Sequence, residues 1–427
     1  MSFLQTIPEF HSPANGVTLL GITDQRFKRG VVQILFELPL DASRAARSLL
    51  LDVLEQGSAQ FPDQTSLARE SQNLFGASCE LYTERSCESH IVGIQMSCLG
   101  EQFLPSGEEV LVPILDLATG ILFEPLRGQG AGELFETKYL ERERKNLLDM
   151  LDERKDDRGE YASERFKSVM CADEEYGKLS WESSEAVAAV TAQQLEDARL
   201  EIIQRAEVTI ICSGSANVDK VKHWAAQRFD MQRDVIALAE PSIKFPSALR
   251  HVNEHLEMEQ AKLHIGLRLH LPQEIADREA LIAACSILGG GSHGRLFQKV
   301  REEKSLAYGI YSQLHGRKHI LSISAGIDAS SAAEVEAEVF RQIDLLATEG
   351  PTAYEMELSQ ANRLNGLAAL ADSPGAMASF YHGNHVLGLN ATPAIRAEAC
   401  QRLTAEQIQQ AATGWQPDLV YLLSAAE

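Results

Sequence analysis

A chain of 427 residues with a formal net charge of −22 is long enough for two or more domains, and its charge argues against nucleic-acid and anionic-membrane partners. Hydrophobic residues make up 44% of the chain, as in ordinary globular proteins. No apolar run approaches the roughly 20 residues that span a bilayer, and no signal peptide is visible at the N-terminus. The seven scattered cysteines, without a C-x-x-C pair, favour free thiols and a cytoplasmic location.

The first half of the chain predicts an alternation of strands and helices. Residues 31–40 alternate apolar and polar side chains, which predicts a strand. A helix is expected over 43–56, with Ser43 as its N-cap and Gly57 as its stop. The further elements expected in this half are a helix from about Thr65, strands over 77–85 and 90–99, and a charged helix over 133–157 with a leucine stripe.

The second half repeats this order. Residues 66–83 align with residues 295–312 without a gap, so the chain is expected to contain two copies of one α+β domain. The elements expected in this half are strands over 261–271, 306–314 and 319–327 and helices over 277–288 and 294–304.

The expected organisation has three parts. Residues 1–233 would form an N-terminal domain and residues 251–427 a C-terminal domain. Residues 234–250 contain two prolines and show no clear period, which is typical of an extended connector.

Residues 289–311, GGGSHGRLFQKVREEKSLAYGIY, carry the most informative motif, a glycine turn followed by an amphipathic helix and a strand. The segment resembles the C-terminal-half motif of the pitrilysin/insulinase zinc peptidases, the family that includes mitochondrial processing peptidase. In that family an Arg and a Tyr at the spacing of Arg301 and Tyr308 hold the substrate backbone beside the metal. This chain has Ser305 where the family usually has Gly. Without the resemblance, Tyr308 would be expected in the core, as an aromatic residue in an alternating strand.

The zinc motif of that family, H-x-x-E-H, is degenerate here. On a helix, residues i and i+4 share a face, so two histidines can bind one zinc while the Glu activates its water. Counting back from the glycine that ends the helix places Ser48 and Asp52 at the histidine positions and Leu51 at the position of the general base. The distal ligand position falls on Met150, with Glu153 close by. We therefore expect no zinc and no catalytic residue in this chain.

A literal H-x-x-E-H occurs elsewhere, as His251, Glu254 and His255. Alternating apolar residues and an upstream proline favour a strand for this segment, in which i and i+4 lie ~13 Å apart. That separation is too large for one zinc, whose ligands lie near ~2 Å. The motif is therefore interpreted as a chance match at a solvated strand edge.

The resemblance implies a fold and a function. Each half would be a mainly antiparallel sheet covered by helices, and the chain would form half of a clam shell. Some bacterial members work as pairs, in which one chain keeps H-x-x-E-H and the other supplies the Arg/Tyr pair. We expect a non-catalytic subunit of a heterodimeric zinc metallopeptidase that is inactive alone. Arg301 and Tyr308 would bind the peptide substrate, and the zinc would belong to the partner chain.

Two alternatives stay open from the sequence. One alternative is that the chain is itself a metallopeptidase that uses His251, Glu254 and His255 or unrecognised ligands. The other alternative is a scaffold that cuts nothing, as with the family's respiratory-complex core subunits.

Overall fold

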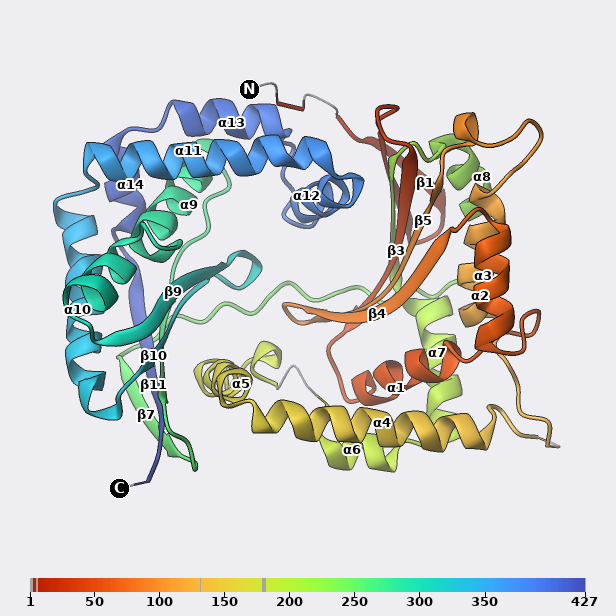
Figure 1. Cartoon of the computed structure of the whole chain (residues 1–427), viewed down its shortest axis with the longest axis horizontal. Coiled ribbons are helices and arrows are strands. Elements are labelled where there is room, and N and C mark those ends of the chain that lie inside the picture. The colour runs from red at the N-terminus through yellow and green to blue at the C-terminus, as the bar shows by residue number, and fades with distance from the viewer. Residues whose placement is uncertain (1–2, 5–6, 131, 179–181, 427) are drawn as a thin grey trace.

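Two β-sheets stand opposite each other in the computed structural model, which describes residues 3–4, 7–130, 132–178 and 182–426 (Figure 1). The strands of the first sheet, in spatial order, are β1 (Glu9–Ala14), β2 (Val17–Thr23), β6 (Glu207–Gly214), β3 (Arg29–Pro39), β5 (Ser89–Leu99) and β4 (Ser78–Ser86). Those of the second sheet are β7 (Arg250–His255), β11 (Gln416–Ser424), β8 (Ala261–Arg268), β10 (Ile320–Ile327) and β9 (Ala307–His315).

The two sheets share one topology. Apart from the extra edge strand β1, each position of the first sheet has a counterpart in the second, and β2–β6 and β7–β11 are both parallel. The other neighbouring strands are antiparallel. Every strand expected from alternation forms, with its ends displaced by a few residues. The expected fold class, two homologous halves of mainly antiparallel sheet covered by helices, is confirmed.

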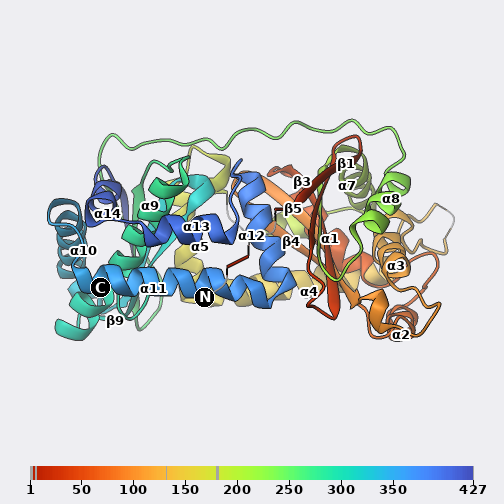
Figure 2. The same ribbon diagram turned by 90° about the horizontal axis from the view of Figure 1, so that it is seen from above.

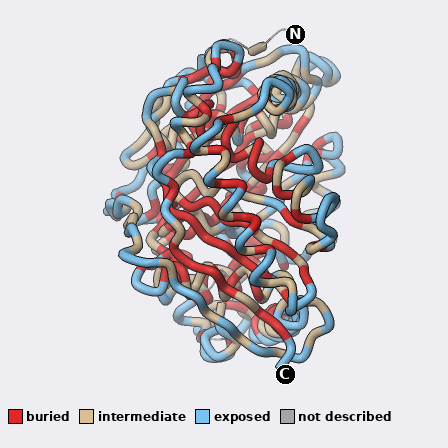
Figure 3. The backbone as a smooth tube through the Cα atoms, turned by 90° about the vertical axis from the view of Figure 1, so that its left-hand side faces the viewer, coloured by how far each residue is buried: buried red, intermediate tan, exposed pale blue. Residues whose placement is uncertain are grey.

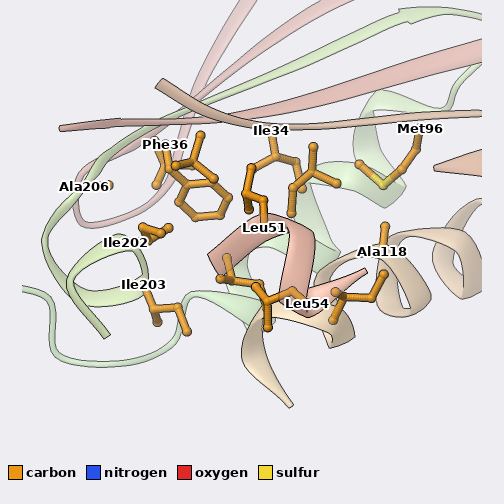
Figure 4. Packing of buried hydrophobic residues seen from close by; sticks show 14 of the residues in the cluster. Ile34, Phe36, Leu51, Leu54, Met96, Ala118, Ile202, Ile203 and Ala206 are labelled. Carbon is orange, nitrogen blue, oxygen red and sulfur yellow. The ribbon is translucent and has the colours of Figure 1, made fainter. Parts of the chain in front are cut away.

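The outer face of each sheet carries a helix-covered core. The helices on the first sheet are α1 (Arg44–Leu54), α3 (Leu111–Phe123), α7 (Ala192–Arg205) and α8 (Val218–Arg228). In that core, Ile34 and Phe36 of β3 face Leu51 and Leu54 of α1 (Figure 4). The elements on the second sheet are α9 (Ile275–Gly289), the π-helical segment η3 (Phe297–Glu303), α10 (Ala332–Thr348) and α14 (Ala405–Ala412).

Two sequence expectations for the helices need adjustment. Ser43 precedes α1 as expected, but its hydroxyl makes no capping hydrogen bond, and its backbone N–H instead donates to Asp41 Oδ1 at 2.8 Å. The helix expected over 294–304 forms largely as the π-helical segment η3. Further helices are α2 (Gln64–Asn73), α4 (Thr137–Asp156), α6 (Ser184–Ala189), α11 (Ala353–Ala369) and α13 (Pro393–Gln401).

Each half sends one helix across to the inner face of the other half's sheet. Helix α5 (Arg158–Met170) packs Phe166 and Met170 on the second sheet, where Gly266 leaves room for both side chains. Helix α12 (Pro374–Val386) packs Met377 and Tyr381 on the first sheet, against a cluster separate from the outer core. Both helices lie between the sheets (Figure 1).

The halves are also joined by an extended connector. Residues 231–249 contain neither helix nor strand and run along one edge of the molecule from the first half to the second (Figure 2). Burial is concentrated on the strands that these layers enclose, while the helix exteriors remain exposed (Figure 3).

Candidate substrate-binding site and degenerate metal position

The degenerate metal position lies in a cavity between α1, β4, α4 and α5, with a volume of about 680 Å³. Ser48 and Asp52 of α1 both line it, as residues one helical turn apart should. Met150 of α4 lines it too, whereas Glu153 is exposed and is not among the lining residues. The residue expected at the distal-ligand position therefore presents a thioether to the cavity, and the nearby carboxylate of Glu153 does not line it.

None of these groups is available in the form that a zinc site needs. Ser48 Oγ donates a hydrogen bond to Glu182 Oε1 at 2.9 Å, and Leu51 is buried in the outer core. Burial raises the pKa of Asp52 to about 7, and the carboxylates of Glu55, Glu143 and Glu182 reinforce the shift. The residues at the family position therefore do not fit zinc, which takes deprotonated N, S or O ligands. Among all described residues, no group of three or more His, Cys, Asp or Glu could hold a metal ion.

The helix end before Tyr308 is closed by a left-handed residue. Ser305 has a φ of 56°. The N–H of Leu306 donates to the carbonyl of Val300 at 2.9 Å, and the N–H of Ser305 donates to the carbonyl of Arg301 at 3.0 Å. The bond from Ser305 is that of an αL C-cap, whose left-handed position favours glycine, and the bond from Leu306 spans one residue more, as fits the end of a π-helical segment. The cap gives a physical reason for a glycine at this position of the motif, and it ties the backbone of Arg301 to the start of β9.

A β-bulge turns Tyr308 out of the core. Ala307 and Gly309 face consecutive residues of β10, so Tyr308 is the extra residue and has no partner. The buried side chains of Ala307 and Ile310 both point into the outer core of the second sheet. Tyr308 is 61% exposed and Tyr311 is 57% exposed. Uninterrupted alternation would have given a different set of exposed positions on β9.

The polar groups of the Arg/Tyr pair are accessible. Tyr308 donates its hydroxyl to Asp328 Oδ1 at 3.0 Å, and this bond raises the pKa of the phenol. The guanidinium of Arg301 lies over the ring of Phe297, 4.6 Å from its centroid, and the side chain is 43% exposed. The Arg301 Nε atom is 3.9 Å from Glu302 Oε1, which is a loose ion pair. Asp328 and Phe297 are partners that sequence reasoning did not identify.

The literal H-x-x-E-H lies on the edge strand β7, as its sequence predicted. Its three side chains have separate partners: His251 Nε2 is 2.8 Å from Glu336 Oε1, Glu254 pairs with Arg165 and Tyr421, and His255 Nδ1 is 3.3 Å from Ser424 Oγ. The bond from Arg165 lowers the pKa of Glu254. Because the three side chains are engaged separately, they form no common metal site.

Comparisons with known proteins agree with the motif and the fold. A family model described as "Peptidase M16 inactive domain" matches residues 189–363. The chain is 22% identical over 425 residues to the "Probable inactive metalloprotease YmfF" of Bacillus subtilis, covering 99% of each chain. It is 32% identical over 135 residues to the "Uncharacterized zinc protease YmxG" of the same organism, covering 31% of this chain and 32% of that one. The chain thus resembles the M16 peptidases in both sequence and fold.

Solved structures show the same fold. A conserved protein from Enterococcus faecalis superimposes with a TM-score of 0.90 at 22% identity, covering 99% of each chain. A peptidase M16 inactive domain from Pseudomonas fluorescens superimposes with a TM-score of 0.79 at 18% identity, covering 98% of each chain. The likeness to these structures shows that the chain has their fold. Within its described residues, no helix is both long and apolar enough to cross a membrane.

Proposed function

We propose that this chain is the non-catalytic subunit of a heterodimeric zinc metallopeptidase, in which it binds the peptide substrate and forms part of the chamber wall. The observation that carries the proposal is the outward-facing hydroxyl of Tyr308 on the bulge of β9. The Arg301 guanidinium lies near the capped end of η3, the helical segment that precedes this strand. An aromatic side chain at a strand position loses packing when it is exposed, so its exposure calls for a compensating role.

The two side chains would hold a peptide backbone by hydrogen bonds. The stack on Phe297 restricts the Arg301 guanidinium and leaves donors at its edge, which suits a carbonyl oxygen. Tyr308 would release Asp328 and donate its hydroxyl to a carbonyl that gains negative charge. The zinc would belong to a homologous partner with an intact H-x-x-E-H motif, and it would supply the Lewis acid for hydrolysis.

We further propose a cytoplasmic location. All seven cysteines are free, and burial raises the pKa of several thiols, including Cys212 and Cys285, which keeps them protonated. Free thiols in this number are typical of a reducing compartment.

Reconstitution with a partner tests the function. The chain should be co-purified with an M16 chain that carries H-x-x-E-H, and turnover of unstructured peptides should be measured for each chain and for the complex. We expect cleavage by the complex and none by this chain alone. Tyr308→Phe and Arg301→Ala should each lower turnover by roughly 10²-fold, the scale of one lost oxyanion donor.

A matched control is available on the same half. Tyr354 on α11 is 66% exposed, so Tyr354→Phe removes a comparable exposed hydroxyl and should leave turnover unchanged. Melting temperatures of all variants should stay near wild type, because both target side chains are exposed. Unchanged turnover in both target variants would refute substrate binding and favour the scaffold alternative. Cleavage and one bound zinc in the chain alone would favour the peptidase alternative.

A further inference from the structure

Equivalent hairpins of the two halves meet at their tips. The β4–β5 turn carries Glu88, and the β9–β10 turn carries Lys318. Lys318 Nζ lies 2.6 Å from Glu88 Oε1, and the lysine side chain is only 1% exposed. Beside this pair, Arg317 Nη1 donates to Ser86 Oγ at 2.6 Å. At the hairpin tips, the contact between the halves is thus made by charged side chains, of which Lys318 is fully buried.

A second carboxylate from the first half completes the buried cluster. Glu174, which follows α5, lies between two cations of the second half: its Oε1 accepts from Arg268 Nη2 at 2.8 Å, and its Oε2 is 2.5 Å from Lys318 Nζ. Arg268 also donates through Nε to Asp418 Oδ2 at 2.9 Å. The side chains of Glu174 and Arg268 are 2% and 1% exposed. We name Glu88, Glu174, Arg268 and Lys318 the inter-half latch.

The latch also fixes the connector. The backbone N–H of Ser242 donates to Glu88 Oε2 at 3.0 Å, and the carbonyl of Ser242 accepts a hydrogen bond from Lys318 Nζ. The middle of the extended segment is therefore bound through both of its backbone polar groups. A connector held in this way cannot act as a free tether between the halves.

Buried ion pairs favour the one arrangement of the two halves in which every buried charge keeps its partner. A buried ion pair adds little net stability relative to the same two ions solvated by water. Separating the partners while either stays buried leaves an unpaired charge, which carries a high free-energy cost. Any swing of one half against the other would pull Glu88 and Glu174 from Lys318 and Arg268. It would also lift α5 and α12 from the sheets that they cover.

We propose that the inter-half latch is a conformational device that locks the two halves into one rigid body. The relative placement of the Tyr308 hairpin and the first half is then set before any substrate arrives. If the chain is a subunit as proposed above, the chamber opens between chains and not within this one. The lock itself is a property of the isolated chain and needs neither partner nor substrate.

Amide hydrogen exchange of the isolated chain tests the lock. Lys318→Met keeps the length of the side chain and removes its charge. We expect the amides of α5 and α12 to exchange at least about tenfold faster than in wild type, because opening of the halves becomes easier. The amides of the central strands β3 and β8 should keep wild-type exchange, since they lie within the halves.

Controls separate the lock from general stability. Lys299→Met removes an exposed lysine that pairs with Glu303 inside one half, and it should leave exchange everywhere at wild type. Glu88→Gln is a milder break of the latch and is measured in the same way if Lys318→Met does not accumulate as folded protein. Unchanged exchange of α5 and α12 would refute the proposal. Equal acceleration of β3 and β8 would refute it too, because the latch residues would then support only overall stability.

Discussion

Replacement of Ser305 by Gly tests the interpretation of the capped helix end beside the Arg/Tyr pair. Ser305 is exposed and holds a left-handed backbone with φ of 56°. For an L-residue with a Cβ this conformation costs roughly 1–2 kcal/mol, whereas glycine adopts it without that penalty. Glycine in turn loses more backbone entropy on folding, by about 0.5–1 kcal/mol. The net expectation is that Ser305→Gly stabilises the cap by about 0.5–1 kcal/mol.

The assay is local, because a chain with two sheets need not unfold in one step. Amide exchange of a peptide covering residues 300–310 reports opening of the bond from the Leu306 N–H to the Val300 carbonyl. A gain of about 0.8 kcal/mol slows that exchange roughly fourfold. Ser305→Ala is the matched control, since it removes the hydroxyl and keeps the Cβ, and it should bring no gain.

Two outcomes would contradict the argument about the cap. Exchange that is no slower in Ser305→Gly than in wild type would mean that the left-handed backbone carries no strain. Equal slowing in Ser305→Ala would mean that the hydroxyl, and not the backbone, is the unfavourable group.

Three further results are expected from the degenerate metal position and from one buried histidine. The triple variant Ser48→His, Leu51→Glu and Asp52→His should bind no stoichiometric zinc by metal analysis, because Met150 occupies the distal slot; strong peptidase activity would contradict this. Asp52→Asn should stabilise the chain at pH 8 by more than about 1 kcal/mol, measured by urea denaturation. The gain should fade towards pH 4, because a carboxyl with a pKa raised to about 7 costs stability progressively as the pH rises from about 4 to about 7. His264, whose pKa burial lowers to about 3, stabilises the fold above pH 6.5 and loses that contribution on acidification, so wild type should lose about 2 kcal/mol relative to His264→Asn between pH 7 and pH 5. Parallel urea midpoints for the two proteins would contradict that last expectation.

The strands could be predicted because each has one face on a helix-covered core. Residues 31–40 and 261–271 alternate, and β3 and β8 form there, since burial of one face imposes a period of two on the sequence. Apolar alternation also predicted the strand at His251–His255, although the segment spells a zinc motif that requires a helix. Periodicity also indicated that α4 would bury a leucine stripe, which includes Leu140, Leu147 and Leu151.

The sequence predicted only some of the residues of the candidate site. Spacing and family resemblance singled out Arg301 and Tyr308, but the bulge that exposes Tyr308 depends on its pairing with β10, which local sequence does not encode. Asp328 was missed because it lies on a later segment and meets Tyr308 only through that pairing. Glu182 was missed in the same way, since it reaches Ser48 across the fold.

By itself, the sequence predicted the repeat of two α+β halves and the extended connector between them. These properties follow from periodicity and residue type, which are local. The tertiary structure alone decided the exposure of Tyr308, the raised pKa of Asp52 and the ionic contact between Glu88 and Lys318. Each of these depends on how far water is excluded and on which distant group approaches, and both are set when the two sheets and their crossing helices pack together.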